Sequence, residues 1–274
     1  MNYYCYIASL PDIQIDNSKN IPELSTLCTE ISEILNENDN NLFRTFLMRY
    51  DNENILRIIK DKDVEINALA SLTKDDLIEI LKILDETENP KDSRIFPYFS
   101  QFYNTINNEQ ESAEILSQED FLNTLYYDFA ANVKNKFVAD WFEFNLNVNN
   151  LLTAQICRNH GLDYKKSIVG NNVVAKTIRK SNARDFDLSG IFEPLEKIIN
   201  ISEEKNLLER EKQLDAIKWN WLEENTVFNY FSVEKILAFW LRCEILNRWN
   251  GLSIEKGKEV FDGILTGMKT KAQF

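Results

Sequence analysis

Apolar residues recur along most of the chain at intervals of three and four, which is the spacing of one face of an α-helix. The clearest early run comprises Leu24, Leu27, Cys28, Ile31, Ile34 and Leu35. The same period returns over residues 42–59, 77–81, 121–141, 207–221 and 233–249. Because no segment shows the alternation that is typical of strands, the pattern predicts an all-α fold.

Short polar signals divide these runs into separate helices. Thr73 with Asp76 and Ser117 with Asp120 have the spacing of capping boxes, so each pair predicts a helix start. The helical pattern that opens at Ser117 continues to residue 160. Since an unbroken helix of that length would span about 60 Å, we expect a break within residues 145–150.

A short pattern occurs three times within the apolar runs. An acidic or amide residue is followed three positions later by asparagine, in the pairs Asp51 and Asn54, Asn147 and Asn150, and Glu244 and Asn247. The three asparagines are 96 and 97 residues apart. Asparagine is abundant in this chain, so only the even spacing and the shared apolar frame separate the pattern from chance. It predicts one helical domain, residues 1–274, built from three related units of about 1–110, 111–200 and 201–274.

Charge restricts the possible partners. The 274-residue chain has a formal net charge of −13 at pH 7, which disfavours binding to nucleic acid. The stretch from Arg158 to Arg184 is a local exception, since its seven basic residues face only Asp163. It is either an ordinary solvated segment or a patch for an acidic partner or lipid headgroups.

The residues that usually carry chemistry are sparse. The only histidine, His160, precedes Gly161 at an expected helix end, and the chain has no E-x-x-H sequence. The cysteines lie far apart, at Cys5, Cys28, Cys157 and Cys243, so we expect buried, reduced thiols, as in the cytoplasm. The carboxylate clusters are typical of solvated helix faces. We therefore predict no catalytic, cofactor-binding or metal-ligating residues, and no apolar stretch is long enough to span a membrane.

Together with the tyrosine-rich start of the chain, the three patterns carry a family resemblance. They resemble the C-subunit family of the V/A-type rotary ATPases, whose eukaryotic counterpart is the d-subunit, and more closely its short bacterial variant. The first copy matches best, at Asp51, Asn54 and Ile55. In the third copy Arg248 stands where an aliphatic residue is expected, and Pro11 interrupts the expected first helix.

The resemblance implies a non-catalytic adaptor on the cytoplasmic face of the membrane. It implies three helical units in one funnel-like array, with the membrane rotor ring on one face and the central-shaft proteins on the other. We hypothesise that the three asparagines bond the backbone at equivalent helix bends; the alternative is asparagine enrichment without a special role. Two other functions remain open: a small-substrate enzyme that uses a carboxylate cluster, and a helical regulatory protein that binds through the basic stretch.

Overall fold

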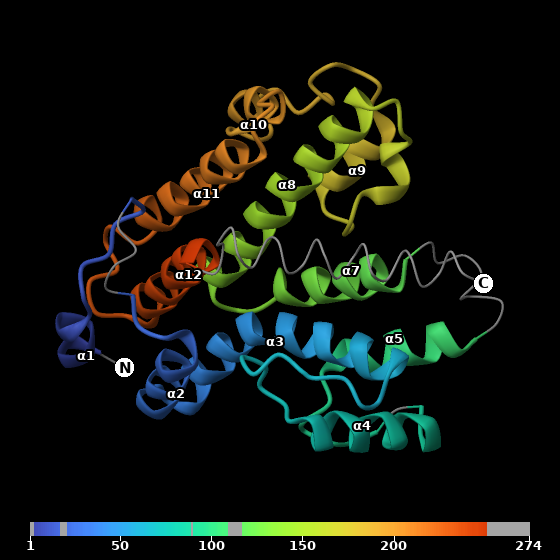
Figure 1. Cartoon of the computed structure of the whole chain (residues 1–274), viewed down its shortest axis with the longest axis vertical. Coiled ribbons are helices and arrows are strands. Elements are labelled where there is room, and N and C mark those ends of the chain that lie inside the picture. Colours follow the sequence, from blue (N-terminus) through green and yellow to red (C-terminus); the bar gives the residue numbers. More distant parts are fainter. Residues whose placement is uncertain (1–2, 17–20, 89, 109–116, 251–274) are drawn as a thin grey trace, which may run out of the picture. The chain divides into compact units, whose positions relative to one another are not determined.

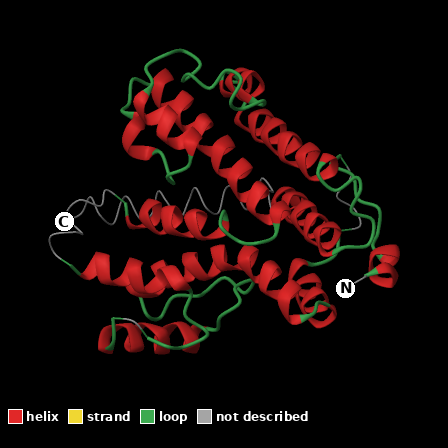
Figure 2. Cartoon of the chain, turned by 180° about the vertical axis from the view of Figure 1, so that it is seen from behind, coloured by secondary structure: helices red, strands yellow, loops and turns green. Residues whose placement is uncertain are grey.

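The structure is a computed structural model that describes residues 3–16, 21–88, 90–108 and 117–250. Within these ranges the chain forms helices joined by loops and has no β-strand (Figures 1 and 2), which confirms the all-α prediction. The helices are α1 (Tyr4–Ser9), α2 (Leu24–Ile34), α3 (Glu37–Lys60), α4 (Lys74–Glu86), α5 (Pro97–Asn107), α7 (Gln118–Ala130), α8 (Lys136–Asn159), the 3-10 helix η1 (Tyr164–Ser167), α9 (Val173–Lys180), α10 (Leu195–Ser202), α11 (Leu207–Glu224) and α12 (Val233–Asn250).

Internal contacts divide the chain into two compact units. The larger unit is Ile34–Lys218, and the smaller combines Met1–Glu33 with Trp219–Phe274. The division into three related segments and their funnel-like arrangement remain predictions.

Aromatic side chains hold the centre of the larger unit together. Phe46 of α3 stacks on Phe142 of α8 at 5.1 Å, and Tyr126 of α7 meets the same Phe142 ring edge-on at 5.4 Å. The hydroxyl of Tyr126 donates a hydrogen bond of 2.8 Å to the carbonyl oxygen of Thr45. Each buried aromatic side chain removes a large apolar area from water, so these contacts fix α7 and α8 against α3.

The helix ends are defined by local side chains. Thr73 and Asp76 form the predicted reciprocal capping box at the start of α4. Ser117 accepts a bond from the backbone N–H of Asp120 at the start of α7, as a capping residue should. α3 and α8 are both 24 residues long, and each begins after an asparagine cap, Asn36 and Asn135 respectively.

The expected break within residues 145–150 is wrong. The chain instead turns between Ala130 and Lys136, and α8 continues through all of residues 145–150. The asparagines of this segment do not compete for their own helix backbone, because their side chains bond to groups on neighbouring elements. Asn145, for example, donates to the hydroxyl of Tyr127 at 3.1 Å.

The smaller unit is centred on α12. Its side chains Ile236, Leu237 and Trp240 are fully buried, and the Trp240 indole N–H points to the sulfur of Cys28 at 3.3 Å. At the other end of the chain, the N–H of Tyr3 donates to the carbonyl oxygen of Phe231 at 2.9 Å. Tyr3, directly before α1, is therefore fixed to the loop that precedes α12.

Candidate functional site: the asparagine clamps

Asn54 binds the backbone of one residue in the loop that follows α3. Its side-chain oxygen accepts from the N–H of Asn67 at 2.7 Å, and its amide nitrogen donates to the carbonyl oxygen of Asn67 at 3.1 Å. Asn54 is fully buried, so both polar atoms depend on this partner. We call this two-bond arrangement an asparagine clamp.

Asp51 lies one turn earlier on α3 and holds the end of the same loop. Its carboxylate accepts from the Ser71 hydroxyl at 2.7 Å and from the Leu72 N–H at 2.8 Å. Asp51 is fully buried, and burial raises its pKa, with the two hydrogen bonds and Arg44 opposing that rise. The loop therefore approaches α4 with its last residues fixed to α3.

Asn150 forms a second clamp, on the loop between η1 and α9. Its oxygen accepts from the Val169 N–H at 2.9 Å, and its amide nitrogen donates to the Val169 carbonyl oxygen at 2.7 Å. Asn150 is 3% exposed. The donor, the acceptor and the two-bond geometry thus match those of Asn54.

Asn147 occupies the position of Asp51 in this second copy. Its side-chain oxygen accepts from the amide of Asn172 at 2.8 Å, and Asn172 is the residue that caps α9. In both copies the residue three positions before the clamp therefore holds the chain just before the helix that follows the clamped loop, α4 or α9.

The third copy lies on α12 and differs in its surroundings. Asn247 is exposed and Glu244 is half-buried. The clamped residues lie 13 positions after Asn54 and 19 after Asn150, and the corresponding positions after Asn247 lie outside the described residues. The structure therefore brings Asp51 with Asn54, and Asn147 with Asn150, into matching arrangements, and it leaves the third pair as a prediction.

The clamps bond loop residues, whereas the sequence led us to expect bonds at helix bends. Their partners, Asn67 and Val169, contribute only backbone atoms to the clamp, so no side-chain signal in the sequence identified them. Gly170, next to Val169, has a φ of +77° and lies against Leu146 of α8. A glycine directly after the clamped residue is required by this backbone conformation and by the close approach of the helix.

Two members of the basic stretch have internal partners. The guanidinium of Arg179 donates to the carbonyl oxygens of Ile168 and Gly170, each at 2.7 Å, and so supports the clamped loop. Arg158 lies over the ring of Phe186 at 3.6 Å and donates to the carbonyl oxygen of Arg184. The remaining basic side chains are exposed: Lys165, Lys166, Lys176, Lys180 and Arg184.

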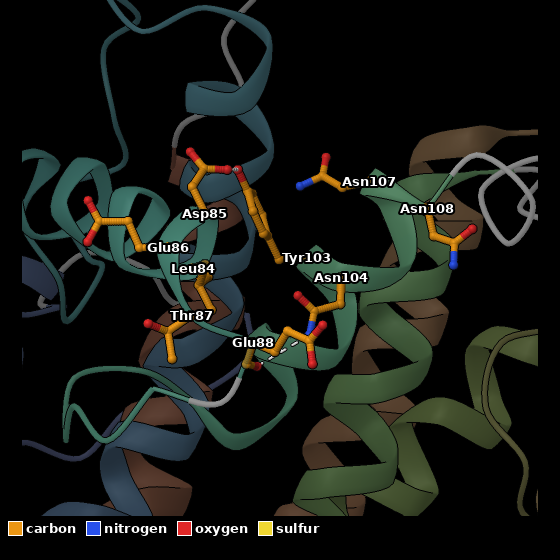
Figure 3. Close-up of a pocket in the computed structure, with 9 residues that line it drawn as sticks. All are labelled: Leu84, Asp85, Glu86, Thr87, Glu88, Tyr103, Asn104, Asn107 and Asn108. Atoms are coloured by element: carbon orange, nitrogen blue, oxygen red, sulfur yellow. Dashed lines mark hydrogen bonds between the residues drawn. The ribbon is translucent and has the colours of Figure 1, made fainter.

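A hollow of about 780 Å³ lies between the C-terminal ends of α4 and α5 (Figure 3). Its walls carry three acids, Asp85, Glu86 and Glu88, and the hydroxyl of Tyr103 donates to Asp85 at 2.5 Å. Burial is the main cause that raises the pKa of Tyr103, and the bond to Asp85 adds to it. The hollow is polar, and Leu84 is the one aliphatic side chain in its wall.

Other candidates for chemistry are scattered over the described chain. Within it, no group of three or more His, Cys, Asp or Glu side chains is placed to hold a metal ion. His160 caps the C-terminal end of α8, as the sequence predicted. Cys243 is buried and its pKa is raised to about 12 by burial, whereas Cys5 is exposed, so the expectation of uniformly buried thiols is wrong. None of the described helices has the length and apolar character needed to cross a bilayer.

Comparison with known proteins adds a family but no activity. No curated protein and no solved structure matches the chain. One family model does match, over residues 1–272, and its description is "Protein of unknown function (DUF2764)". The chain therefore belongs to the DUF2764 family.

Proposed function

We propose that this protein is a non-catalytic adaptor of a V/A-type rotary ATPase, which couples the central shaft to the membrane rotor ring. The observation that carries the proposal is the pair of asparagine clamps. Two helices of equal length, α3 and α8, each use the same residue pattern to hold the loop that leads to the next helix. Such a repeated, cross-braced unit is what the resemblance to the C-subunit family implies.

A mechanical role requires resistance to deformation rather than a reactive group. Each clamp adds two partly buried hydrogen bonds between a helix and a loop, beside the bonds that Asp51 and Arg179 make to the same loops. The aromatic contacts of Phe142 with Phe46 and Tyr126 join the two clamped helices through α7. Torque applied to one helix would therefore be carried to the other without the loops unfolding first.

The alternatives receive less support from particular observations. An enzyme of the carboxylate type would need convergent acids with perturbed pKa values in an enclosed site. In the hollow beside α4, the acid Asp85 is already bonded to Tyr103. A regulatory protein that binds through the basic stretch would lose Arg158 and Arg179 from its binding surface, because both have internal partners.

Copurification tests the proposal directly. The full chain, carrying an affinity tag, is expressed in its native host at normal levels and recovered from detergent-solubilised membranes. We expect the shaft and rotor-ring proteins of a rotary ATPase to copurify with it in fixed proportion. Recovery of the chain without these proteins, from membranes shown to contain the assembled ATPase, would reject the proposal.

A variant pair then connects the clamps to the function. Asn54→Ala and Asn150→Ala together should lower ATP-driven ion pumping in membrane vesicles more than ATP hydrolysis, because a softened adaptor transmits torque less completely. Asn200→Ala is a matched control, since Asn200 is an exposed asparagine within helix α10. Equal losses of pumping and hydrolysis would point to lost assembly, and unchanged pumping would contradict the mechanical role of the clamps.

A further inference from the structure

The loop between α11 and α12, together with Tyr4 of α1, carries a group of exposed large side chains. We call this group the aromatic tip, and its exposed fractions are 57% for Tyr4, 52% for Val227, 85% for Phe228, 63% for Tyr230 and 40% for Phe231. All five belong to the smaller unit. The Tyr4 and Phe231 rings are 4.7 Å apart, and those of Tyr230 and Phe231 are 6.3 Å apart, so these three rings form a continuous group. Phe228 lies two residues before Tyr230 on the same loop.

Backbone and side-chain bonds hold the loop beneath these side chains. Thr226 is buried, and its hydroxyl donates to the carbonyl oxygen of Leu222 at 2.6 Å. The N–H of Asn229 donates to the carbonyl oxygen of Thr226 at 3.1 Å. The bond from Tyr3 to Phe231 fixes the start of α1 to the same loop. Because the loop is already ordered, its aromatic side chains can bind a partner with a small entropic cost.

The apolar helix residues on either side of the loop are buried, in contrast to the apolar side chains of the loop itself. Val233, two residues after Phe231, is 6% exposed, and Leu222, before the loop, is fully buried. Contiguous exposed apolar groups of this kind mark surfaces that bind proteins or membranes. Rigid aromatic side chains supply much of the binding energy at protein interfaces.

The charges beside the aromatic tip distinguish between these two kinds of partner. From residue 223 to residue 235 the chain carries three acids, Glu223, Glu224 and Glu234, and one base, Lys235. Glu223 is also 3.6 Å from Arg242 of α12, so the charge available to a partner rests mainly on Glu224. Lys235 is half-buried, whereas Glu224 is exposed. An acidic rim repels anionic lipid headgroups and attracts lysine and arginine. The charges therefore favour a protein surface with basic residues at its edge.

We propose that the aromatic tip docks into an apolar groove of a protein partner whose rim carries lysine or arginine. Phe228 is the central anchor because it is the most exposed member of the group. Glu224 pairs with the basic rim. This interaction follows from the tip alone and does not depend on the partner being part of a rotary ATPase.

Site-specific cross-linking identifies what touches the tip. The photoreactive residue benzoylphenylalanine replaces Phe228 in the full chain, which is expressed in its native host and irradiated. The control carries the same residue at position 162, because Leu162 is 62% exposed and lies in the larger unit. We expect position 228, and not position 162, to cross-link to one protein, at a peptide that contains aliphatic residues flanked by lysine or arginine.

Affinity measurements with the purified partner then test the chemistry. Phe228→Ser should weaken binding about tenfold or more, as for a central aromatic anchor, whereas Phe228→Trp and Leu162→Ser should retain it. Glu224→Lys should also weaken binding and reduce its dependence on salt. The melting temperature of each variant serves as a control for folding.

Three results would overturn the proposal. The first is a cross-link from position 228 to a second copy of this chain, with a dimer in sedimentation that Phe228→Ser abolishes. The second is binding to vesicles of phosphatidylcholine and phosphatidylglycerol that Phe228→Ser abolishes. The third is the absence of a cross-link specific to position 228, or an affinity that Phe228→Ser leaves unchanged.

Discussion

Replacing Asn54 with alanine tests the clamp most directly. The substitution removes both bonds to Asn67 and leaves its N–H and carbonyl oxygen without their partner. A hydrogen bond contributes about 1 kcal/mol net, and a buried polar group left unpaired costs about 1–3 kcal/mol. Asn67 is half-buried, so water restores part of this loss. We therefore expect Asn54→Ala to lower the free energy of unfolding by about 3 kcal/mol.

The same reasoning applies to Asn150→Ala, because its two bonds to Val169 have similar lengths. The two clamps share no partner, so the losses should add in the double variant. Urea unfolding followed by circular dichroism measures each loss. Since the two compact units need not unfold together, hydrogen exchange at the Asn67 and Val169 amides provides a local measurement. Each amide should lose protection only when its own asparagine is replaced.

A third variant separates the hydrogen bonds from side-chain packing. Asn54→Asp keeps the shape, but an ionised carboxylate turns an oxygen toward the carbonyl oxygen of Asn67. Burial and this repulsion should raise the folded-state pKa of the new carboxyl group above its unfolded value of about 4. Stability is then retained below about pH 4 and lost as pH rises through the folded-state pKa.

The reasoning would be refuted by either of two results. One is an Asn54→Ala loss no larger than that of the exposed control Asn200→Ala, which should lie within about 0.5 kcal/mol of zero. The other is an Asn54→Asp variant whose stability, relative to the unsubstituted chain, is the same at pH 4 and pH 7.

Three further predictions concern the surroundings of the clamps. Gly170→Ala and Gly190→Ala both place alanine at a φ of +77°, which costs about 1–2 kcal/mol. Only Gly170→Ala also adds a Cβ at 2.7 Å from Leu146, so thermal unfolding should show a larger loss of stability for Gly170→Ala than for Gly190→Ala. Equal losses of stability would exclude a steric contribution from Leu146. Because burial raises the folded-state pKa of Asp51, the stabilisation from this carboxyl group is present below about pH 4 and is lost as pH rises. Asp51→Asn should therefore make the melting temperature less dependent on pH between 4 and 7. An unchanged dependence of the melting temperature on pH would contradict this. Arg94 bonds Asp76, Glu79 and Asp92; it is the main cause that lowers the pKa of Glu79 and Asp92, and it adds to the bond from Thr73 in lowering that of Asp76. The stabilisation from these pairs is present above about pH 4 and is lost on acidification, so Arg94→Ala should reduce the loss of stability below pH 4, and an identical acid transition in both proteins would refute the assignment.

Local signals in the sequence predicted much of the fold. The capping pair Thr73 and Asp76 marked the start of α4 because the two residues bond each other and need no tertiary partner. The helix break was misplaced because an asparagine-rich segment reads as a helix breaker when its partners are unknown. In α8 those partners lie on other elements, such as Tyr127, and are not encoded locally.

The clamps themselves were half predictable. The recurrence of Asp51 with Asn54 and of Asn147 with Asn150 was visible as a pattern. Which residues the asparagines bind was not, because the partners are peptide groups, which every residue carries. The aromatic tip went unpredicted for a related reason: Phe228, Tyr230 and Phe231 have the composition of a core segment, and only the fold shows that they point outward.

An asparagine that recognises a peptide group leaves the intervening chain free to vary. Asn54 holds a residue 13 positions downstream and Asn150 one 19 positions downstream, yet both anchors have the same form. Insertions of several residues are therefore tolerated between clamp and target, provided that the clamped peptide group returns to the helix. The junction between the exposed residues Leu162 and Asp163, just before η1, is consequently a suitable place to insert a short tag or spectroscopic label without disturbing the second clamp.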